Sequence, residues 1–239
     1  MRRFLFWSLC FCLLFPVGLS SCDGSDSAAV IFGGTTGKLT WTLTEDGVLT
    51  ITGEGPMPDY RDGGTSETPP WYPHVNRISS LTIGEGVTRI GDYAFMLCSF
   101  VTKVVIPESV TSMGDWAFNY CTGLQEAYIG DGVTEIAAKA FAECTALKTV
   151  VIGKSIQRIG DQAFNTRSSW DQMTLEKITV LFDDIASGSF PVLESGSRGV
   201  FPKPGGWDLV SYKIYVPKGT KAEYQKNWSD YSSLIVEMQ

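Results

Sequence analysis

The hydrophobic pattern of this chain repeats at a fixed interval. Isoleucine recurs every 23 residues in four successive segments, at Ile83, Ile106, Ile129 and Ile152. Each segment opens with alternating apolar and polar residues, passes through a turn marked by Gly or Pro, and ends with an Ala-Phe pair. Alternation is typical of a half-buried strand, and Gly and Pro mark turns. We therefore expect each copy to form a strand, a turn, a second short extended piece and a helical turn.

One copy of this pattern cannot bury its own apolar positions, because all of them point to the same side of the coil. Stacking supplies the missing partner, with neighbouring strands about 4.8 Å apart. A period of about 20 to 29 residues is typical of leucine-rich-repeat solenoids. The sequence thus predicts a leucine-rich-repeat solenoid of mixed α/β, strand-rich character, built from stacked 23-residue coils.

Two interior rows follow from the same interval. Phenylalanine fills one and should form a spine, at Phe95, Phe118, Phe141 and Phe164. Cysteine fills another, at Cys98, Cys121 and Cys144. These three cysteines and the single histidine do not supply a tetrahedral metal site at a known spacing. Adjacent rungs lie within disulfide range, but an odd number of thiols pointing the same way favours buried free thiols that pack as small hydrophobic groups.

Both ends of the repeat array carry patterns typical of caps, which seal the apolar faces of terminal coils. Strands expected over 39–44 and 48–52 flank an Asp-Gly turn, a strong hairpin signal. We assign Trp71 to the core of this N-terminal cap and His74 to a surface or cap-packing role. At the other end we expect a strand over 213–217 and a short amphipathic helix over 220–228.

The repeats and caps fit one domain over residues 30–239. We place the N-terminal cap at 30–80, the repeats at 81–182, and a last repeat with the C-terminal cap at 183–239. After Phe164 the interval lengthens around residues 167–171, which we expect to bulge from the edge or the helical side of the solenoid.

Residues 1–21 have the order of a secretory signal peptide: two arginines, an apolar run and then small residues. The run is too short to cross a bilayer of about 30 Å. Its ending, Leu-Ser-Ser-Cys, resembles a lipobox, which would make Cys22 the lipidated first residue of the mature protein. The alternative is an ordinary secretory signal with an incidental cysteine. Residues 22–29 are small and polar, which suits a flexible tether.

The lipobox predicts a lipid anchor in the bacterial outer membrane through Cys22. The acidic residue after Cys22 resembles a signal for export to the cell surface, with the periplasmic face as the alternative. The chain has 19 basic and 26 acidic residues and a net charge of −7, and removal of the leader takes away two more arginines. Because nucleic-acid binding depends on basic residues that neutralise phosphates, we exclude nucleic acid as a partner.

The sequence offers no recognisable catalytic set, so we predict that the protein is not an enzyme and needs no cofactor or metal. His74 is the only histidine, and a Ser-His-Asp or Cys-His arrangement would have to use it. Paired carboxylates occur at Glu45-Asp46 and Asp183-Asp184, but these fall in expected turns rather than across a cleft.

Alternation also predicts which strand residues face solvent. These residues are Lys103, Val105, Glu126, Tyr128, Thr149, Val151, Lys177 and Thr179. Tyr128 would lie between two valines, giving the apolar centre and charged margin that interfaces favour. Tyr93 and Trp116 form a second candidate surface on the helical side. The alternative is that the first face is ordinary exposed sheet or is covered by an end cap.

The whole pattern resembles the BspA-like leucine-rich-repeat family of bacterial cell-surface lipoproteins. The resemblance rests on the W-T-L-T-E-D-G-V-L-T-I-T opening, the P-W-Y at 70–72, the V-T-x-I-G-D-x-A-F-x-x-C-x-x-L repeats and the closing Y-V-P. It implies a surface protein without catalytic residues, some relatives of which bind host matrix proteins such as fibronectin or take part in adhesion.

Two functions agree with these observations. The first is a non-catalytic, surface-exposed binding or adhesion module that recognises a protein or glycan, such as host extracellular matrix. The second is a structural or assembly component of the cell envelope that contacts other bacterial proteins.

Overall fold

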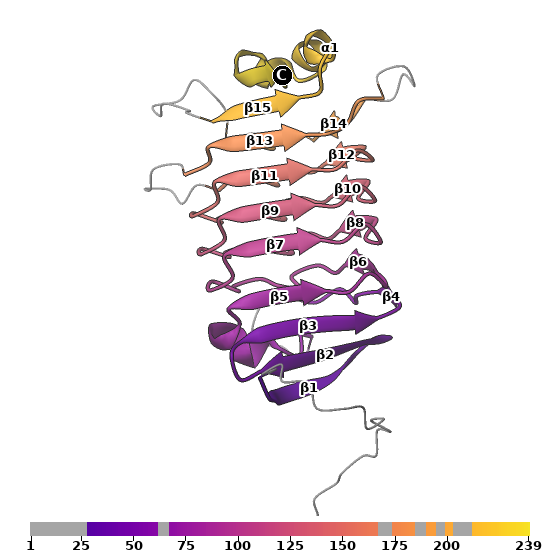
Figure 1. Ribbon diagram of the computed structural model, residues 1–239, viewed down its shortest axis with the longest axis vertical. Helices are drawn as coiled ribbons and strands as arrows, with labels where there is room; N and C mark the ends of the chain where they lie inside the picture. The colour runs from indigo at the N-terminus through magenta and orange to yellow at the C-terminus, as the bar shows by residue number, and fades with distance from the viewer. Residues whose placement is uncertain (1–27, 62–66, 167–173, 185–189, 195–198, 203–211) are drawn as a thin grey trace, which may run out of the picture.

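The computed structural model describes residues 28–61, 67–166, 174–184, 190–194, 199–202 and 212–239. The expected signal peptide, Cys22, most of the tether and the expected bulge at 167–171 lie outside these residues, so those expectations stay predictions. Within the described part, the chain climbs from the N-terminal strands to the C-terminal helix as one stack of coils (Figure 1).

Two parallel sheets line two sides of this stack, and the coils in its middle each contribute one short strand to each sheet. The first sheet contains β7 (Lys103–Ile106), β9 (Glu126–Ile129), β11 (Thr149–Ile152), β13 (Lys177–Val180), β15 (Lys213–Val216) and β16 (Ile235–Glu237). The second contains β4 (Gly55–Pro56), β6 (Val87–Ile90), β8 (Ser112–Met113), β10 (Glu135–Ile136), β12 (Arg158–Ile159) and β14 (Val192–Leu193). The predicted leucine-rich-repeat solenoid is confirmed.

Corresponding residues of successive coils lie in register. In the first sheet, Ile106, Ile129 and Ile152 pair directly with one another. Ile83 belongs to the coil before, in β5 (Ser80–Ile83), which pairs with β3 (Val48–Gly53) instead of β7. β5 and β7 therefore belong to different sheets. In the second sheet the same two coils do pair, through β6 and β8.

The third side of each coil is an irregular turn, and the expected helical turn is wrong. The residue before each Ala-Phe pair has a left-handed backbone, with φ of 55° at Tyr93, 58° at Trp116 and 57° at Lys139. Such a residue interrupts a right-handed helix. The main chain bonds instead to the next coil: the N–H of Phe95 donates to the carbonyl of Ala117 at 2.8 Å, and the same bond recurs in the next two coils.

The predicted aromatic spine runs through the interior of the stack. The four predicted rings are at most 1% exposed, and successive centroids lie 5.1 to 5.2 Å apart. The spine is longer than predicted, because Trp71 stacks on Phe95 at 5.6 Å and Phe201 stacks on Phe164 at 5.4 Å. The apolar core is therefore one continuous column from the N-terminal cap to the C-terminal cap.

The cysteine row lies beside this spine as three free, buried thiols. The Sγ–H of Cys121 donates to the carbonyl of Phe95, and that of Cys144 donates to the carbonyl of Phe118, both at 3.1 Å. Burial raises the pKa of Cys98 and Cys121 well above the usual value, which keeps these thiols protonated. They pack as small hydrophobic groups, as the sequence analysis favoured.

The N-terminal cap is the predicted hairpin with one extra strand on each side. The hairpin consists of β2 (Leu39–Thr44) and β3, and β1 (Val30–Thr36), which the sequence analysis missed, pairs antiparallel with β2. Trp71 is fully buried, and its Nε1–H donates to the carbonyl of Ala94 at 2.8 Å. His74, in the 3-10 turn η1 (Tyr72–Arg77), stacks on Phe32 with centroids 3.8 Å apart. Both residues pack in the cap as predicted.

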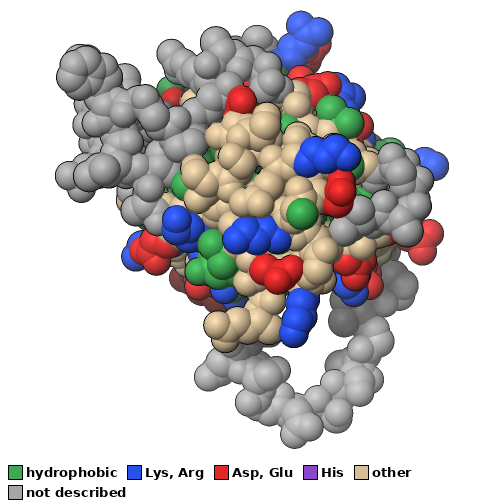
Figure 2. Space-filling view, turned by 90° about the horizontal axis from the view of Figure 1, so that it is seen from above, with side chains coloured by type: hydrophobic (Ala, Val, Ile, Leu, Met, Phe, Trp, Pro, Cys, Tyr) green, Lys and Arg blue, Asp and Glu red, His purple; other side chains and the backbone are tan. Residues whose placement is uncertain are grey.

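The C-terminal cap consists of β15, β16, the helix α1 (Lys221–Asn227) and the 3-10 turn η3 (Ser229–Leu234). Buried tyrosines fasten it to the stack: the hydroxyl of Tyr224 donates to the carbonyl of Phe182 at 2.9 Å, and that of Tyr212 to Pro202 at 2.7 Å. Seen from above, the described residues at this end carry basic and acidic side chains interspersed with apolar ones (Figure 2).

Phe118→Ala would remove a ring from the middle of the spine. Truncation of a buried Phe costs about 3–5 kcal/mol. We expect a fall of that size in the free energy of unfolding measured with chemical denaturant. The control Val105→Ala, at a side chain that is 55% exposed, should change it by less than about 0.5 kcal/mol. An unchanged unfolding midpoint for Phe118→Ala would contradict the stacking register.

The buried tyrosines predict a loss of stability at alkaline pH. Burial raises the pKa of Tyr60 and of Tyr231 to about 12, and that of Tyr212 and Tyr224 further still. Tyrosine in the unfolded chain ionises at about pH 10. Above that pH the unfolded chain holds fewer protons than the folded one, so the free energy of unfolding falls as the pH rises. Thermal melts should show a Tm that falls from about pH 10 upward, less steeply in Tyr60→Phe. Equal slopes in both proteins would argue against this cause.

Candidate binding surface

The outward face of the first sheet brings the predicted surface residues together. Pairing of β7, β9 and β11 places Val105, Tyr128 and Val151 side by side in one row. The neighbouring row consists of Lys103, Glu126 and Thr149. Val105 is 55% exposed, and Tyr128 and Val151 are half-buried. The alternate residues of the same strands are buried, so alternation placed all six outward residues correctly.

Lys103 fixes the centre of this surface. Its Nζ lies 3.4 Å from Oε2 of Glu126 and 4.5 Å from the ring centroid of Tyr128. A cation over an aromatic ring at an exposed site contributes about 0.5–1 kcal/mol. The contact therefore favours the orientation of the tyrosine seen here, which lowers the entropic cost of binding.

The outward face of the first sheet is less exposed near the C-terminal cap. The expected exposure of Thr179 is wrong. Thr179 lies on the outward face of β13 but is only 8% exposed. Its row neighbours are Val151 of β11 and Tyr215 of β15, and Lys177 extends over the Tyr215 ring at 4.9 Å from its centroid. These larger side chains cover the short threonine. Lys177 and Tyr215 thus form the margin of the surface.

The second predicted pair, Tyr93 and Trp116, lies on the turn side. The two rings are nearly parallel, with centroids 6.1 Å apart, and the Nζ of Lys139 lies 4.2 Å from the Trp116 centroid. Tyr93 and Lys139 come from the coils before and after, so they cover the two faces of the indole. This leaves the edge of the ring for contact with a partner, which makes the pair less suited to stacking a ligand.

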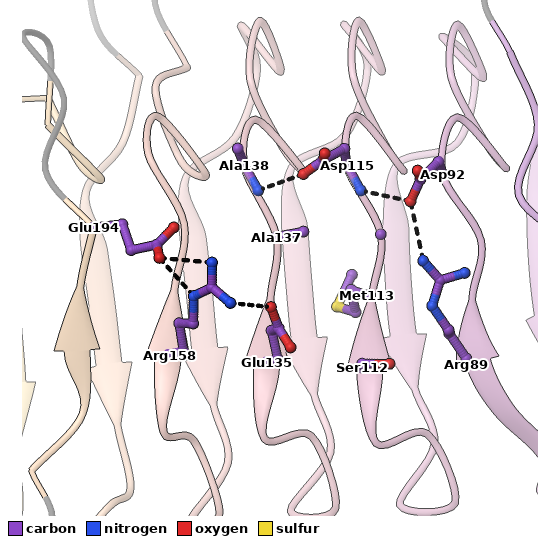
Figure 3. Close-up of a pocket in the computed structure, with 11 residues that line it drawn as sticks. Arg89, Asp92, Ser112, Met113, Asp115, Glu135, Ala137, Ala138, Arg158 and Glu194 are labelled. Atoms are coloured by element: carbon purple, nitrogen blue, oxygen red, sulfur yellow. Dashed lines mark hydrogen bonds and ion pairs between the residues drawn. The ribbon is translucent and has the colours of Figure 1, made fainter.

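A shallow groove of about 400 Å³ on the second sheet was not identified from the sequence (Figure 3). It follows one row of residues across four coils: Arg89, Ser112, Glu135 and Arg158. Arg158 bridges Glu135 at 2.9 Å and Glu194 at 2.6 Å. The signal was present in the sequence, because these four positions recur at the repeat interval while their charge changes from coil to coil.

A ladder of aspartates borders the groove (Figure 3). Oδ1 of Asp59 accepts from the N–H of Asp92 at 3.0 Å, Oδ1 of Asp92 from the N–H of Asp115 at 3.0 Å, and Oδ1 of Asp115 from the N–H of Ala138 at 2.9 Å. Each carboxylate therefore binds a main-chain donor one coil further along. The ladder stops at Ala138, which has no carboxylate, and Ala138 lines the groove there.

The first two carboxylates of this ladder differ in the direction of their pKa shifts. Burial raises the pKa of Asp59, but the hydrogen bond from Asp92 and the ion pair with Arg89 outweigh it, so the pKa lies below its usual value. Burial and repulsion by Asp59 raise the pKa of Asp92. The groove combines two arginines with four carboxylates, and all four of those carboxylates come from residues that line it: Asp92, Asp115, Glu135 and Glu194.

The paired carboxylates considered as candidate catalytic groups lie at exposed positions, as expected. Glu45 and Asp46 lie exposed in the turn between β2 and β3, and Asp183 and Asp184 are exposed after β13. In the described ranges, no cluster of three or more His, Cys, Asp or Glu residues is arranged to hold a metal ion. The same ranges include no helix with the length and apolar character needed to span a bilayer.

Known proteins share this repeat. A family model described as the BspA type leucine-rich repeat region matches residues 72–190 in six copies. The chain belongs to this BspA-type leucine-rich-repeat family. Six copies exceed the four that were recognised by their isoleucines. Proteins of this bacterial family are typically binding modules and are generally non-catalytic.

Solved structures agree on the fold. A leucine-rich repeat protein from Eubacterium ventriosum is 26% identical, with a TM-score of 0.54, over 79% of this chain and 44% of that one. The pneumococcal vaccine antigen PcpA is 16% identical, with a TM-score of 0.54, over 83% of this chain and 46% of that one. The BspA-type chain thus spans less than half of either protein. No protein with a curated description matches it.

Asp115→Ala would extend the gap in the aspartate ladder by one coil. The change leaves the N–H of Ala138 without the carboxylate that it binds at 2.9 Å. Loss of a hydrogen bond to a charged group costs about 1.5–3 kcal/mol, and less where water can replace it. We expect denaturant unfolding to show a loss of about 1 kcal/mol, with Glu108→Ala in an exposed turn as the control. Equal stability of both variants would show that the ladder does not hold the coils together.

Proposed function

We propose that this BspA-type protein is a non-catalytic, surface-exposed binding or adhesion module, and that its partner is a protein or glycan. The partner would contact the outward face formed by Lys103, Val105, Glu126, Tyr128, Thr149 and Val151. The observation that carries the proposal is Tyr128, which lies between an exposed and a half-buried valine and beside the ion pair of Lys103 with Glu126. Host extracellular matrix is the partner class that the family resemblance suggests.

The residues of this face favour a binding surface over ordinary exposed sheet. Interfaces concentrate their energy in central aromatic anchors surrounded by polar rims. Tyr128 supplies the anchor, and the ion pair of Lys103 with Glu126 supplies part of the rim. Exposed ion pairs contribute little to stability, whereas charges at the rim of an interface act on selectivity, which is the role proposed for this pair.

The proposed location is the outer surface of the cell, with a lipid anchor at Cys22. The support is the lipobox-like ending of the leader and the short polar tether that follows it. Protease treatment of whole cells tests this placement, because a surface protein is digested while a periplasmic one is protected. Mass spectrometry of the mature N-terminus would show whether Cys22 carries acyl chains.

Tyr128→Ser tests the binding face. Removal of a central aromatic anchor typically costs about 2 kcal/mol or more of binding free energy, or at least about tenfold in Kd. We expect that loss in surface-plasmon binding to whichever matrix protein or envelope extract component the wild-type protein retains. Melting should change little, because Tyr128 is half-buried and outward.

Tyr120→Ser is the matched control for this test. Tyr120 is 43% exposed and lies on the turn side, away from the proposed face. Equal binding by wild type and Tyr128→Ser would remove the proposed site. A partner found only among envelope proteins would favour the structural or assembly role over host binding.

A further inference from the structure

One joint between neighbouring coils lacks the strand pairing that the following joints have. β7, β9, β11 and β13 pair in register at all four positions of each strand. β5 lies next to β7 in the stack, but it belongs to the sheet of the N-terminal cap, where it pairs with β3 (Figure 1). We call the interval between β5 and β7 the seam.

One of the missing bonds has a chemical cause. At the next joint, the N–H of Gly130, just after β9, donates to the carbonyl of Ile106 at 3.0 Å. The residue at the same position after β7 is Pro107, which has no N–H. The carbonyl of Ile83 therefore lacks the donor that would bind it at the end of the seam.

The interior is less well covered at the seam than at the next coil. Leu81 packs against the core from β5 but is only half-buried, whereas Val104, at the same position of β7, is 1% exposed. Ile83 is 9% exposed, compared with 1% for Ile106. Val105, outward beside the seam, is 55% exposed. The first-sheet side of this joint is therefore looser than the joint that follows it.

The other two sides of the same joint are intact. β6 pairs with β8 in the second sheet, and on the turn side the N–H of Phe95 donates to the carbonyl of Ala117 at 2.8 Å. Phe95 also stacks on Phe118, but the two rings are inclined by 26°, compared with 4° and 7° at the next two joints. Two sides thus hold the coils together, and the inclined rings fit a wedge that is open on the third.

We propose that the seam is a hinge. The N-terminal cap and β5 tilt as one body about the second sheet and the turn side, and β5 pairs with β7 when the seam closes. The two strands are compatible, because Leu81, Thr82 and Ile83 repeat the alternation of β7 and include neither Pro nor Gly.

Closure gains fewer bonds here than at the following joints. The N–H of Lys103 corresponds by register to that of Glu126, which donates to the carbonyl of Thr102 at 3.2 Å, and Val105 follows by alternation. Lys103 and Val105 can therefore bond to β5 on closure, but Pro107 cannot. With this smaller gain, we expect the joint to exchange between an open and a closed arrangement.

The hinge would set how far the outward face of the first sheet extends. Thr42, Thr50 and Thr82 form one outward row of the N-terminal sheet, because β2, β3 and β5 pair at these positions. When the seam closes, this row continues into Val105 and Tyr128. A partner that spans β5 and β7 would then favour the closed arrangement. This consequence for binding rests on the proposed function, whereas the hinge itself does not.

Distances between spin labels test the hinge in the full chain without any partner. Thr40→Cys on β2 and Lys213→Cys on β15 place two labels at exposed sites on opposite sides of the seam, seven strand spacings or roughly 34 Å apart. Lys103→Cys with Lys213→Cys is the matched control, because both sites lie on one side of the seam, roughly 19 Å apart. The unsubstituted chain is the blank for labelling of Cys22.

We expect a broader distribution of distances for the pair that crosses the seam than for the control pair. Pro107→Ala adds the missing N–H and keeps a Cβ at this position, so it should shift the distribution across the seam to shorter distances and narrow it. The control pair should not change. Equal widths for the two pairs, or an unchanged distribution in a folded Pro107→Ala, would overturn the proposal.

Hydrogen exchange followed by NMR gives a second measurement that needs no label. The N–H of Val105 faces the seam, and that of Tyr128 faces the paired strand β7. In the wild type we expect exchange at Val105 to be at least about tenfold faster than at Tyr128. Pro107→Ala should slow exchange at Val105 severalfold and leave Tyr128 unchanged. Equal exchange at the two amides in the wild type, or no slowing at Val105 in the variant, would also overturn the proposal.

Discussion

The structure depends on the stacking of each coil's apolar interior upon the next. A coil of 23 residues cannot bury its phenylalanine, isoleucine and cysteine by itself, and the rings at 5.1 to 5.2 Å spacing show how completely the neighbour supplies the missing surface. Main-chain hydrogen bonds then join most adjacent coils on three sides: the two sheets and the turn side. Because each contact is with the next coil only, stability accumulates along the stack and must end in caps.

This constraint separates the residues that specify the fold from those available for function. Interior positions keep their identity from coil to coil, as the four stacked phenylalanines do. Exterior positions in the same strands change character, from Val105 to Tyr128 to Val151 on one sheet, and from arginine to serine to glutamate on the other. A solenoid offers a flat exterior and few deep cavities, so recognition through patches on a sheet suits it better than catalysis.

The interior could be predicted from the sequence because period and polarity encode it directly. The spine follows from the repeat spacing, the outward face of Tyr128 from alternation, the hairpin from its Asp-Gly turn and the C-terminal helix from its amphipathic pattern. The irregular turn that replaces the expected helical turn could not be predicted, because the left-handed φ at Tyr93 and Trp116 accompanies main-chain bonds to the next coil. The exposure of Thr179 was predicted wrongly because alternation gives the direction of a side chain but not the size of its neighbours. The groove was missed although its four positions recur at the repeat interval.

The missed strand β1 shows why the ends of a solenoid are harder to predict than its middle. Its two glycines and its threonines carry no repeat period, and its pairing with β2 is antiparallel whereas the coils pair in parallel. Inside the stack, every apolar face and every strand edge meets a copy of the same pattern. At an end that match stops, and the sequence must either seal the edge with charge, as α1 does, or leave it able to accept another strand. Among the described residues, the N-terminal edge has the second composition, because β1 carries no charged side chain.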